Sequence, residues 1–186
     1  MTEARVALLE GNGVGLLRER ALAARVQTAL ERLYLIDRVA DVHHFMEPAG
    51  EGRETLLVRE AEDGALEMAL RVPALETDPA SLDSLCQIIE GVSHFVYLTD
   101  RVRARRESTQ LELELQAEVD KFVTTGILLK QQNGREPREL HGLLFQSPRL
   151  DDELRGAERE RYRRANRYAG KYCRRLAPSL TRLEDE

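Results

Sequence analysis

Apolar and polar residues follow a period of three to four positions over two long segments of the chain. Between Gly15 and Leu33 the apolar residues recur at this spacing among arginines and glutamates, which predicts an amphipathic helix. The same period returns over about residues 151–176, so a second amphipathic helix is expected there, ending before Pro178. Residues 179–186 would then form a frayed acidic tail.

Alternation with a period of two, typical of strands, is clearest between residues 54 and 73. Two apolar segments there flank the turn-prone sequence Glu62-Asp63-Gly64, which predicts an antiparallel β-hairpin. One face of the second strand carries only apolar side chains: Leu66, Met68, Leu70 and Val72. One side of the sheet should therefore be covered by helices. Partial alternation also predicts a third strand over about residues 35–46.

A long helix is predicted over about residues 79–104. Asp78 offers an N-cap oxygen, and Pro79 suits the first helical position because its missing N–H has no partner to lose there. Apolar residues then recur every three or four positions as far as a run of arginines that starts at Arg101. This helix has the strongest periodic signal in the chain.

The next segment, over about residues 109–125, fits either a strand or a helix. Its leucines alternate with polar residues as in a strand, but Thr109 and Glu112 match a capping box and strong helix formers dominate. We therefore expect a helix that folds back near Arg106, so that the two helices form a hairpin. Residues 131–148 contain two glycines and two prolines and are expected to be an irregular connection.

Length and composition indicate a globular protein of one domain. The chain has 186 residues, of which 42% are hydrophobic and 33% charged, enough to bury a core without disulfides or metals. The predicted fold class is α+β, with a small antiparallel sheet packed against the helical hairpin, the N-terminal helix and the C-terminal helix. We expect residues 1–178 to form this single domain.

The sequence also bears on where the protein is found. No apolar segment approaches the roughly 20 residues that a membrane-spanning helix needs. The N-terminal residues have no basic segment leading into an apolar one, as an export signal would. We therefore expect a cytoplasmic protein that does not bind a membrane.

One face of the long helix carries side chains that could bind a metal ion. Glu90 and His94 lie one turn apart, and a fold-back near Arg106 would bring Glu114 and Glu118 level with them. An imidazole with carboxylates suits iron, manganese or zinc, and helical bundles often carry such groups on facing helices. These four residues are the candidate site for a divalent metal, and no motif calls for another cofactor. The favoured interpretation, however, is an ordinary Glu–His pair on one helix, with a hydrogen bond across the hairpin that satisfies His94.

The C-terminal helix is strongly basic, although the whole chain carries a formal charge of −5. Four basic residues form a stripe opposite its apolar side: Arg163, Arg167, Lys171 and Arg174. Such a stripe is a candidate site for anions or nucleic acid. The helix's tyrosines, however, are placed on the apolar side by the same periodicity, and the negative charge of the whole chain lowers its non-specific affinity for nucleic acid. A solvated charged face is therefore the favoured interpretation, and nucleic acid is a less favoured partner.

No arrangement of residues predicts a particular reaction. The glycine-rich residues 11–15 complete neither a Walker loop nor a dinucleotide-binding loop, so they are interpreted as a connection. Cys86 and Cys173 are expected to be ordinary thiols. The other histidines, His43, His44 and His141, are expected to make ordinary hydrogen bonds.

Three functional hypotheses remain open. The leading one is a non-catalytic protein-interaction or regulatory module, whose partner is another protein or a second copy of the chain. The alternatives are a metal-dependent enzyme using the glutamate–histidine site and a nucleic-acid binder using the basic stripe.

Overall fold

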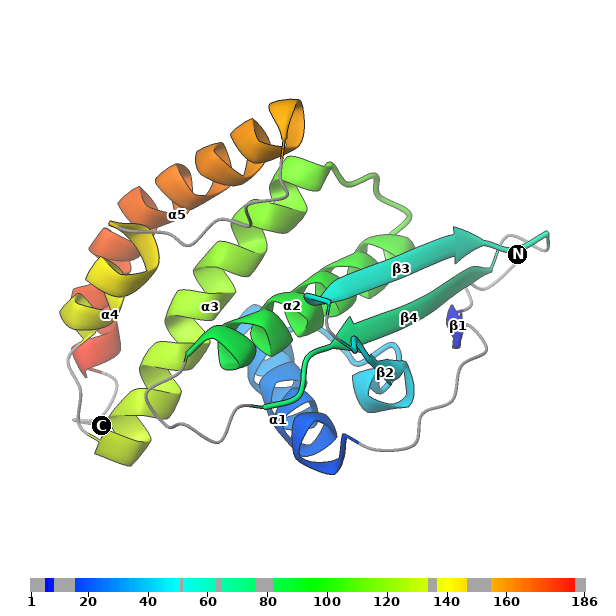
Figure 1. Cartoon of the computed structure of the whole chain (residues 1–186), viewed down its shortest axis with the longest axis horizontal. Helices are drawn as coiled ribbons and strands as arrows, with labels where there is room; N and C mark the ends of the chain where they lie inside the picture. Colours follow the sequence, from blue (N-terminus) through cyan, green and yellow to red (C-terminus); the bar gives the residue numbers. More distant parts are fainter. Residues whose placement is uncertain are drawn as a thin grey trace. The chain divides into compact units, whose positions relative to one another are not determined.

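The computed structural model describes residues 6–8, 16–50, 52–62, 65–75, 82–133, 137–146 and 155–182. Within them the chain forms helices and a small sheet, labelled in Figure 1, and this confirms the α+β class. The chain divides into two compact units, Met1–Ser108 and Thr109–Glu186. The strands, the 3-10 helix and two of the described α-helices belong to the first unit, and three α-helices belong to the second. The expectation of one domain over residues 1–178 stays a prediction.

Strand β4, Leu66–Val72, is the central strand of the sheet in the first unit. Strand β3, Thr55–Glu60, pairs antiparallel with it from Thr55 opposite Arg71 to Glu60 opposite Leu66, which confirms the predicted hairpin. Two short strands, β1 (Val6–Leu8) and β2 (Met46–Pro48), pair parallel with the two halves of β4. The sheet is therefore mixed, not purely antiparallel as expected, because side-chain alternation carries no information on strand direction.

The third strand predicted over residues 35–46 is wrong for most of its length. Only β2 is a strand, and a short 3-10 helix, Val42–His44, precedes it. The buried side chain of Gln27 explains the difference. Its Oε1 accepts a hydrogen bond from the backbone N–H of Val42 over 2.9 Å, and its Nε2 donates one to the carbonyl of Ala40 over 2.7 Å. The segment is thus tied to a helix through one amide instead of to the sheet.

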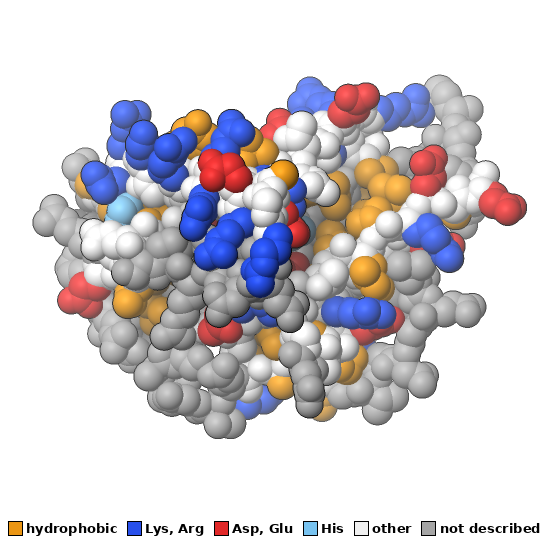
Figure 2. Space-filling view, turned by 45° about the horizontal axis from the view of Figure 1, so that its top comes forward, with side chains coloured by type: hydrophobic (Ala, Val, Ile, Leu, Met, Phe, Trp, Pro, Cys, Tyr) orange, Lys and Arg blue, Asp and Glu red, His pale blue; other side chains and the backbone are white. Residues whose placement is uncertain are grey.

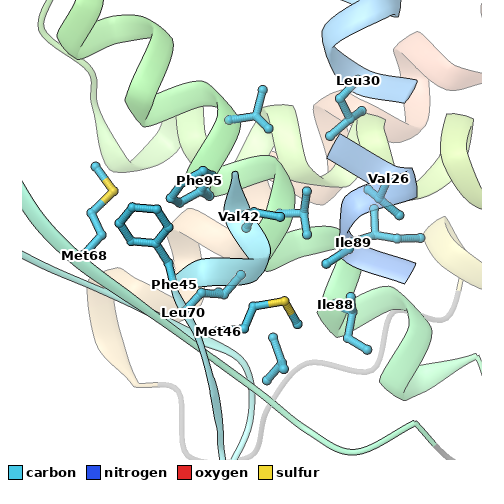
Figure 3. Packing of buried hydrophobic residues seen from close by; sticks show 14 residues of the cluster. Val26, Leu30, Val42, Phe45, Met46, Met68, Leu70, Ile88, Ile89 and Phe95 are labelled. Atoms are coloured by element: carbon cyan, nitrogen blue, oxygen red, sulfur yellow. The ribbon is translucent and has the colours of Figure 1, made fainter. Parts of the chain in front are cut away.

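Helices α1, Leu17–Tyr34, and α2, Asp83–Arg103, cover one face of β4. The helix predicted over Gly15–Leu33 is therefore confirmed. The N-cap predicted at Asp78 and Pro79 lies outside the described residues. Figure 3 shows the shared core, in which side chains of both helices meet the inward face of β4 and the segment before β2. Its largest members include Val26, Leu30, Val42, Phe45, Met46, Met68, Leu70, Ile88, Ile89 and Phe95.

The second unit consists of α3 (Gln110–Asn133), α4 (Pro137–Phe145) and α5 (Gly156–Arg182). Helix is therefore the correct interpretation of residues 109–125, and the capping box is present. The Glu112 carboxylate accepts a hydrogen bond from the Thr109 backbone N–H over 2.7 Å, and Thr109 Oγ1 accepts one from the Glu112 N–H over 3.2 Å. These reciprocal bonds satisfy amides at the start of α3 that have no partner within the helix.

Two differences from expectation concern α4 and the end of α5. Residues 131–148 are not an irregular connection throughout, because α4 forms within them. Helix α5 continues through Pro178 to Arg182. Proline removes a single backbone donor, and packing compensates for it: Ala177 is buried, and Leu180 lies beside Gly126 of α3.

Small residues on α5 pack against larger side chains of α3 and α4 in the core of the second unit. The buried apolar side chains of the three helices are Ala117, Phe122, Val123, Leu140, Ala165, Ala169, Cys173 and Ala177.

Within the part of the chain that the structure describes, no helix is both long and apolar enough to cross a membrane.

Candidate functional site

A cluster of two glutamates and a histidine lies where α2 faces the start of β3 in the first unit. Glu90 and His94 are one turn apart on α2, and each offers a potential ligand atom within 4.8 Å of the other. Across from them, Oε1 of Glu54 lies 3.5 Å from Nδ1 of His94. The side chains of Glu54 and His94 are only 10% and 12% exposed. We call Glu54, Glu90 and His94 the α2 cluster.

The backbone at Glu54 is held against α2 by a chain of side-chain hydrogen bonds. Its N–H donates to Oε1 of Gln87 over 3.0 Å, and Nε2 of Gln87 donates to Asp83 over 2.6 Å. Gln87 lies one turn before Gly91 and two turns before His94 on the same helix. This arrangement aims the Glu54 side chain along α2 towards His94.

Gly91 is the reason that Glu54 can come so close to the helix. A Cβ atom at this position would lie 3.0 Å from Cγ of Glu54 and 2.6 Å from Cδ1 of Leu70. Contacts that short require the neighbouring atoms to move. Glycine therefore lets the sheet and the Glu54 carboxylate pack directly on α2.

The sequence did not indicate Glu54. It lies 40 positions before His94 and at the edge of a predicted strand, where a glutamate is usual. A conspicuous signal was available only at Gly91, a glycine inside a strongly periodic helix, which often marks a close approach of another chain segment.

Glu114 and Glu118, the other two predicted metal ligands, belong to the second unit and are engaged there. Oε1 of Glu114 lies 3.8 Å from Nε of Arg161. Oε1 of Glu118 pairs with Nζ of Lys121 over 2.7 Å, and its Oε2 accepts a hydrogen bond from Asn166 over 2.9 Å. Both carboxylates thus connect α3 to basic or amide groups of their own unit. The four-residue metal site stays a prediction.

The four residues of the predicted basic stripe on α5 are exposed. Arg163, Arg167, Lys171 and Arg174 all point to solvent, and no acidic residue occurs between residues 161 and 182. Figure 2 shows Lys and Arg side chains gathered on the molecular surface. We call the exposed side of α5 from Arg163 to Arg175 the α5 basic face.

The tyrosines of α5 are not placed as expected. Tyr168 and Tyr172 are 40% and 53% exposed, whereas periodicity placed them on the apolar side. The buried seam consists of Ala165, Ala169 and Cys173, each at 0% exposure. Small seam residues allow α5 to pack closely on its neighbours, and the large rings are left at the rim. The α5 basic face therefore carries two aromatic rings among its cations.

Tyr168 is held between two arginines. The Arg167 guanidinium lies 5.2 Å from the centre of the Tyr168 ring, a cation–π distance. Hydrogen bonds from Arg167 and Arg164 to the phenol oxygen lower the pKa of Tyr168, since they stabilise its anionic form. The positive field on this face is thus strong enough to influence a neighbouring side chain.

Among the remaining candidate residues, His141 serves the structure. His141 is buried, and its Nε2 bonds the carbonyl oxygen of Gly170 over 2.8 Å beside the ring of Phe145. His43 and His44 lie on the 3-10 helix with their ring centres 4.0 Å apart. The glycine-rich residues 11–15 lie outside the described residues.

The thiols of the two cysteines lie in different surroundings. Cys86 is half-buried and Cys173 is buried. Burial, followed by the negative charges of Glu118 and Asp120, raises the pKa of Cys173 to about 12. The thiolate is therefore strongly disfavoured at Cys173, which makes this side chain an unreactive part of the core.

A scan against protein-family models finds no match to this chain, and searches of curated proteins and of solved structures find none either.

Proposed function

We propose that the protein is a non-catalytic binding module that takes up single-stranded nucleic acid on the α5 basic face. The observation that carries the proposal is the exposure of Tyr168 and Tyr172 among cations on a helix with no acidic residue after Glu160. Proteins that bind single strands combine a positive surface, which follows the phosphates, with aromatic rings on which bases stack.

The dimensions of the face fit such a partner. Residues 161–182 would extend over roughly 33 Å of helix, at about 1.5 Å per residue. Arg163, Arg167 and Lys171 recur along this length at spacings of four, so consecutive phosphates would meet consecutive cations. Tyr168 and Tyr172 are one turn apart and lie beside this row, within reach of the bases of the same strand.

The exposed rings favour nucleic acid over an acidic protein as the partner. Arginines and lysines alone would serve either class, because the attraction of opposite charges does not distinguish them. Two exposed tyrosines add a π-surface that every base can use, worth about 1–3 kcal/mol per stacked base. The whole chain has a negative formal charge. Nucleic acid should therefore bind at this face and not elsewhere on the surface.

Fluorescence anisotropy with a labelled single-stranded RNA tests the proposal. Affinity should fall steeply between about 50 and 200 mM salt, with a log–log slope of about −3 if four phosphates are neutralised. Replacing Arg163, Arg167, Lys171 and Arg174 together by alanine should weaken binding at low salt by at least about tenfold.

A matched control removes the same charge from the first unit. Arg18, Arg25, Arg32 and Arg106 are exposed, and their joint replacement by alanine should leave most of the affinity intact. Absence of RNA binding at low salt, or an equal loss in both quadruple variants, would refute the proposal. Binding of polyglutamate as tightly as RNA would favour an acidic protein partner instead.

A further inference from the structure

We propose that Arg164, Arg167 and Tyr168 on α5 form a clamp for the terminal phosphate of a single-stranded nucleic acid. We call these three residues the phosphate clamp. As a binding site it rests on the proposed function, and it narrows the partner from any single strand to one that ends in a phosphate monoester. Arg164 is not among the four residues of the basic stripe, so helical periodicity alone did not mark it.

Two guanidinium groups converge on one point of the helix surface. Arg164 and Arg167 both donate hydrogen bonds to the phenol oxygen of Tyr168. Because a single oxygen accepts from both, the two positive charges lie within a few ångströms of each other. The Arg167 guanidinium also lies 5.2 Å from the centre of the Tyr168 ring. The tyrosine thus holds both cations close together.

Helical spacing brings the three side chains of the clamp to one place. Residues three and four positions apart lie on the same side of a helix, and Arg164 is related to Arg167 and Tyr168 by these two intervals. All three residues are exposed. The nearest acidic residue along α5 is Glu160, one turn before Arg164, whereas the Arg164 guanidinium reaches in the other direction to Tyr168.

The pair of arginines is an arrangement that favours a bound anion. Two like charges held this close repel each other, and a neutral phenol oxygen offsets the repulsion only in part. An anion between the guanidiniums would turn the repulsion into two attractions. Clusters of arginine are accordingly a common means of recognising phosphate groups.

The clamp has enough hydrogen-bond donors for a phosphate. A guanidinium carries five N–H groups in a planar fork, and a phosphate can accept two of them in parallel. The bonds to the phenol oxygen use only part of this set, and the Tyr168 hydroxyl can donate its own proton to a phosphate oxygen. Two forks and one hydroxyl thus surround a single position, which suits the three free oxygens of a phosphate monoester.

Charge favours a terminal phosphate over the phosphates inside a strand. A backbone phosphate carries one negative charge, whereas a monoester carries about −1.5 to −2 at pH 7. Two guanidiniums at one point therefore match the monoester better.

The neighbouring ring favours a nucleic acid over a phosphorylated protein as the source of this phosphate. Tyr172 lies one turn after Tyr168 and is 53% exposed. A base next to the bound phosphate would have this ring to stack on, whereas a phosphorylated peptide offers no base. Lys171 and Arg174 then continue the positive surface towards the end of α5, where the following phosphates of the strand would lie.

Fluorescence anisotropy with versions of one internally labelled, single-stranded RNA tests the clamp. The versions carry a 5′-phosphate, a 5′-phosphate capped as its methyl ester, or a free 5′-hydroxyl. We expect the full chain to bind the 5′-phosphate version about tenfold more tightly than the hydroxyl version at equal salt. The methyl ester should lose most of this gain, because it leaves a single negative charge. A preference for a phosphate at either end supports the clamp, and an RNA phosphorylated at its 3′ end identifies the end that is held.

Three variants of the full chain test the residues through the ratio of the affinities for phosphorylated and hydroxyl RNA. Arg164→Gln removes one guanidinium and should lower the ratio from about ten to below about three. Tyr168→Phe keeps the ring but removes the oxygen that joins the arginines, so it should lower the ratio as well. Arg175→Gln is the matched control, since Arg175 is exposed on the same helix outside the clamp. It should weaken both RNAs equally and keep the ratio.

The ratio separates the clamp from the proposed function, because both RNAs are measured on the same protein. Equal affinity of the parent for phosphorylated and hydroxyl RNA would overturn the clamp and leave RNA binding on α5 intact. An unchanged ratio in Arg164→Gln would overturn it too. If neither RNA bound, the proposed function would fail, and the clamp with it. A phosphoserine peptide that bound more tightly than the phosphorylated RNA would assign the clamp to a protein partner and so contradict its assignment to nucleic acid.

Discussion

The side-chain amide of Asn166 donates a hydrogen bond to Oε2 of Glu118 over 2.9 Å, and the same nitrogen lies 3.1 Å from the carbonyl oxygen of Leu144. One buried amide therefore joins α5 to both α3 and α4. The partner oxygens would lose their donor if this amide were removed, and a buried acceptor without a donor costs about 1–3 kcal/mol. Asn166 is accordingly a structural anchor of the second unit.

Asn166→Asp should destabilise the second unit at pH 7 by about 2–3 kcal/mol. The substitution keeps the shape but replaces the donor by a carboxylate beside that of Glu118. Urea unfolding followed by circular dichroism measures the change. Part of the loss should return near pH 4, where carboxyl groups take up protons. Equal stability of the variant and the parent at pH 7 would show that this amide does not hold the helices together.

Gly170→Ala should destabilise the contact between α4 and α5 by about 1–3 kcal/mol, the usual cost of overpacking. A Cβ atom at this position would lie 3.1 Å from both Cβ and Cγ of Phe145. Gly142→Ala on α4 is the matched control, because its new Cβ would meet nothing closer than 3.7 Å. That variant should be stabilised by up to about 1 kcal/mol through helix propensity. In thermal unfolding, we expect the midpoint to fall in Gly170→Ala and to rise in Gly142→Ala.

Cys173 should resist thiol reagents in the folded protein, whereas half-buried Cys86 should react. Two variants separate the thiols: Cys86→Ser leaves only the buried one and Cys173→Ser only the other. At pH 8 we expect Ellman's reagent to label Cys86→Ser at a rate set by unfolding, because the thiolate at Cys173 is disfavoured. Fast labelling of that variant under native conditions would contradict the burial of Cys173.

The raised pKa of Cys173 also makes stability depend on alkaline pH. The folded thiol keeps its proton up to about pH 12, while the unfolded thiol loses it above about 9, so the folded state is progressively disfavoured between these values. The loss should approach about 1.4 kcal/mol per pH unit. Cys173→Ala should show a shallower decline in denaturant midpoints from pH 9 to 11 than the parent. If the denaturant midpoints of the variant and the parent declined in parallel, the Cys173 thiol would not be a cause of the alkaline loss of stability.

Tyr172→Ala should weaken RNA binding by roughly tenfold, and Tyr172→Phe should leave it nearly unchanged. Phenylalanine keeps the ring for stacking and loses only the hydroxyl, while alanine loses the ring. Tyr172 is 53% exposed, so neither change should disturb the core. Anisotropy at low salt measures both variants. A loss of affinity in the phenylalanine variant equal to that in alanine would exclude base stacking as the role of the ring.

Much of the secondary structure was predictable because it depends on neighbouring residues. The β3–β4 hairpin followed from alternation around a turn, and α1 followed from its helical period. Thr109 and Glu112 indicated a helix start that the structure contains, because both partners of a capping box lie within one turn. Strand direction was not predictable, since the parallel strands β1 and β2 meet β4 through segments far away in the chain.

The candidate sites were likewise predictable from the sequence only in part. The sequence by itself determined that Glu90 and His94 share a helix face and that α5 carries a basic stripe, because helical geometry relates residues three or four apart. Only the tertiary structure brought Glu54 to His94, through an approach that Gly91 permits. Tertiary packing likewise buried the alanine seam of α5 and left Tyr168 exposed. A helical period states which residues share a face, whereas the neighbour that covers the face decides which of them reach solvent.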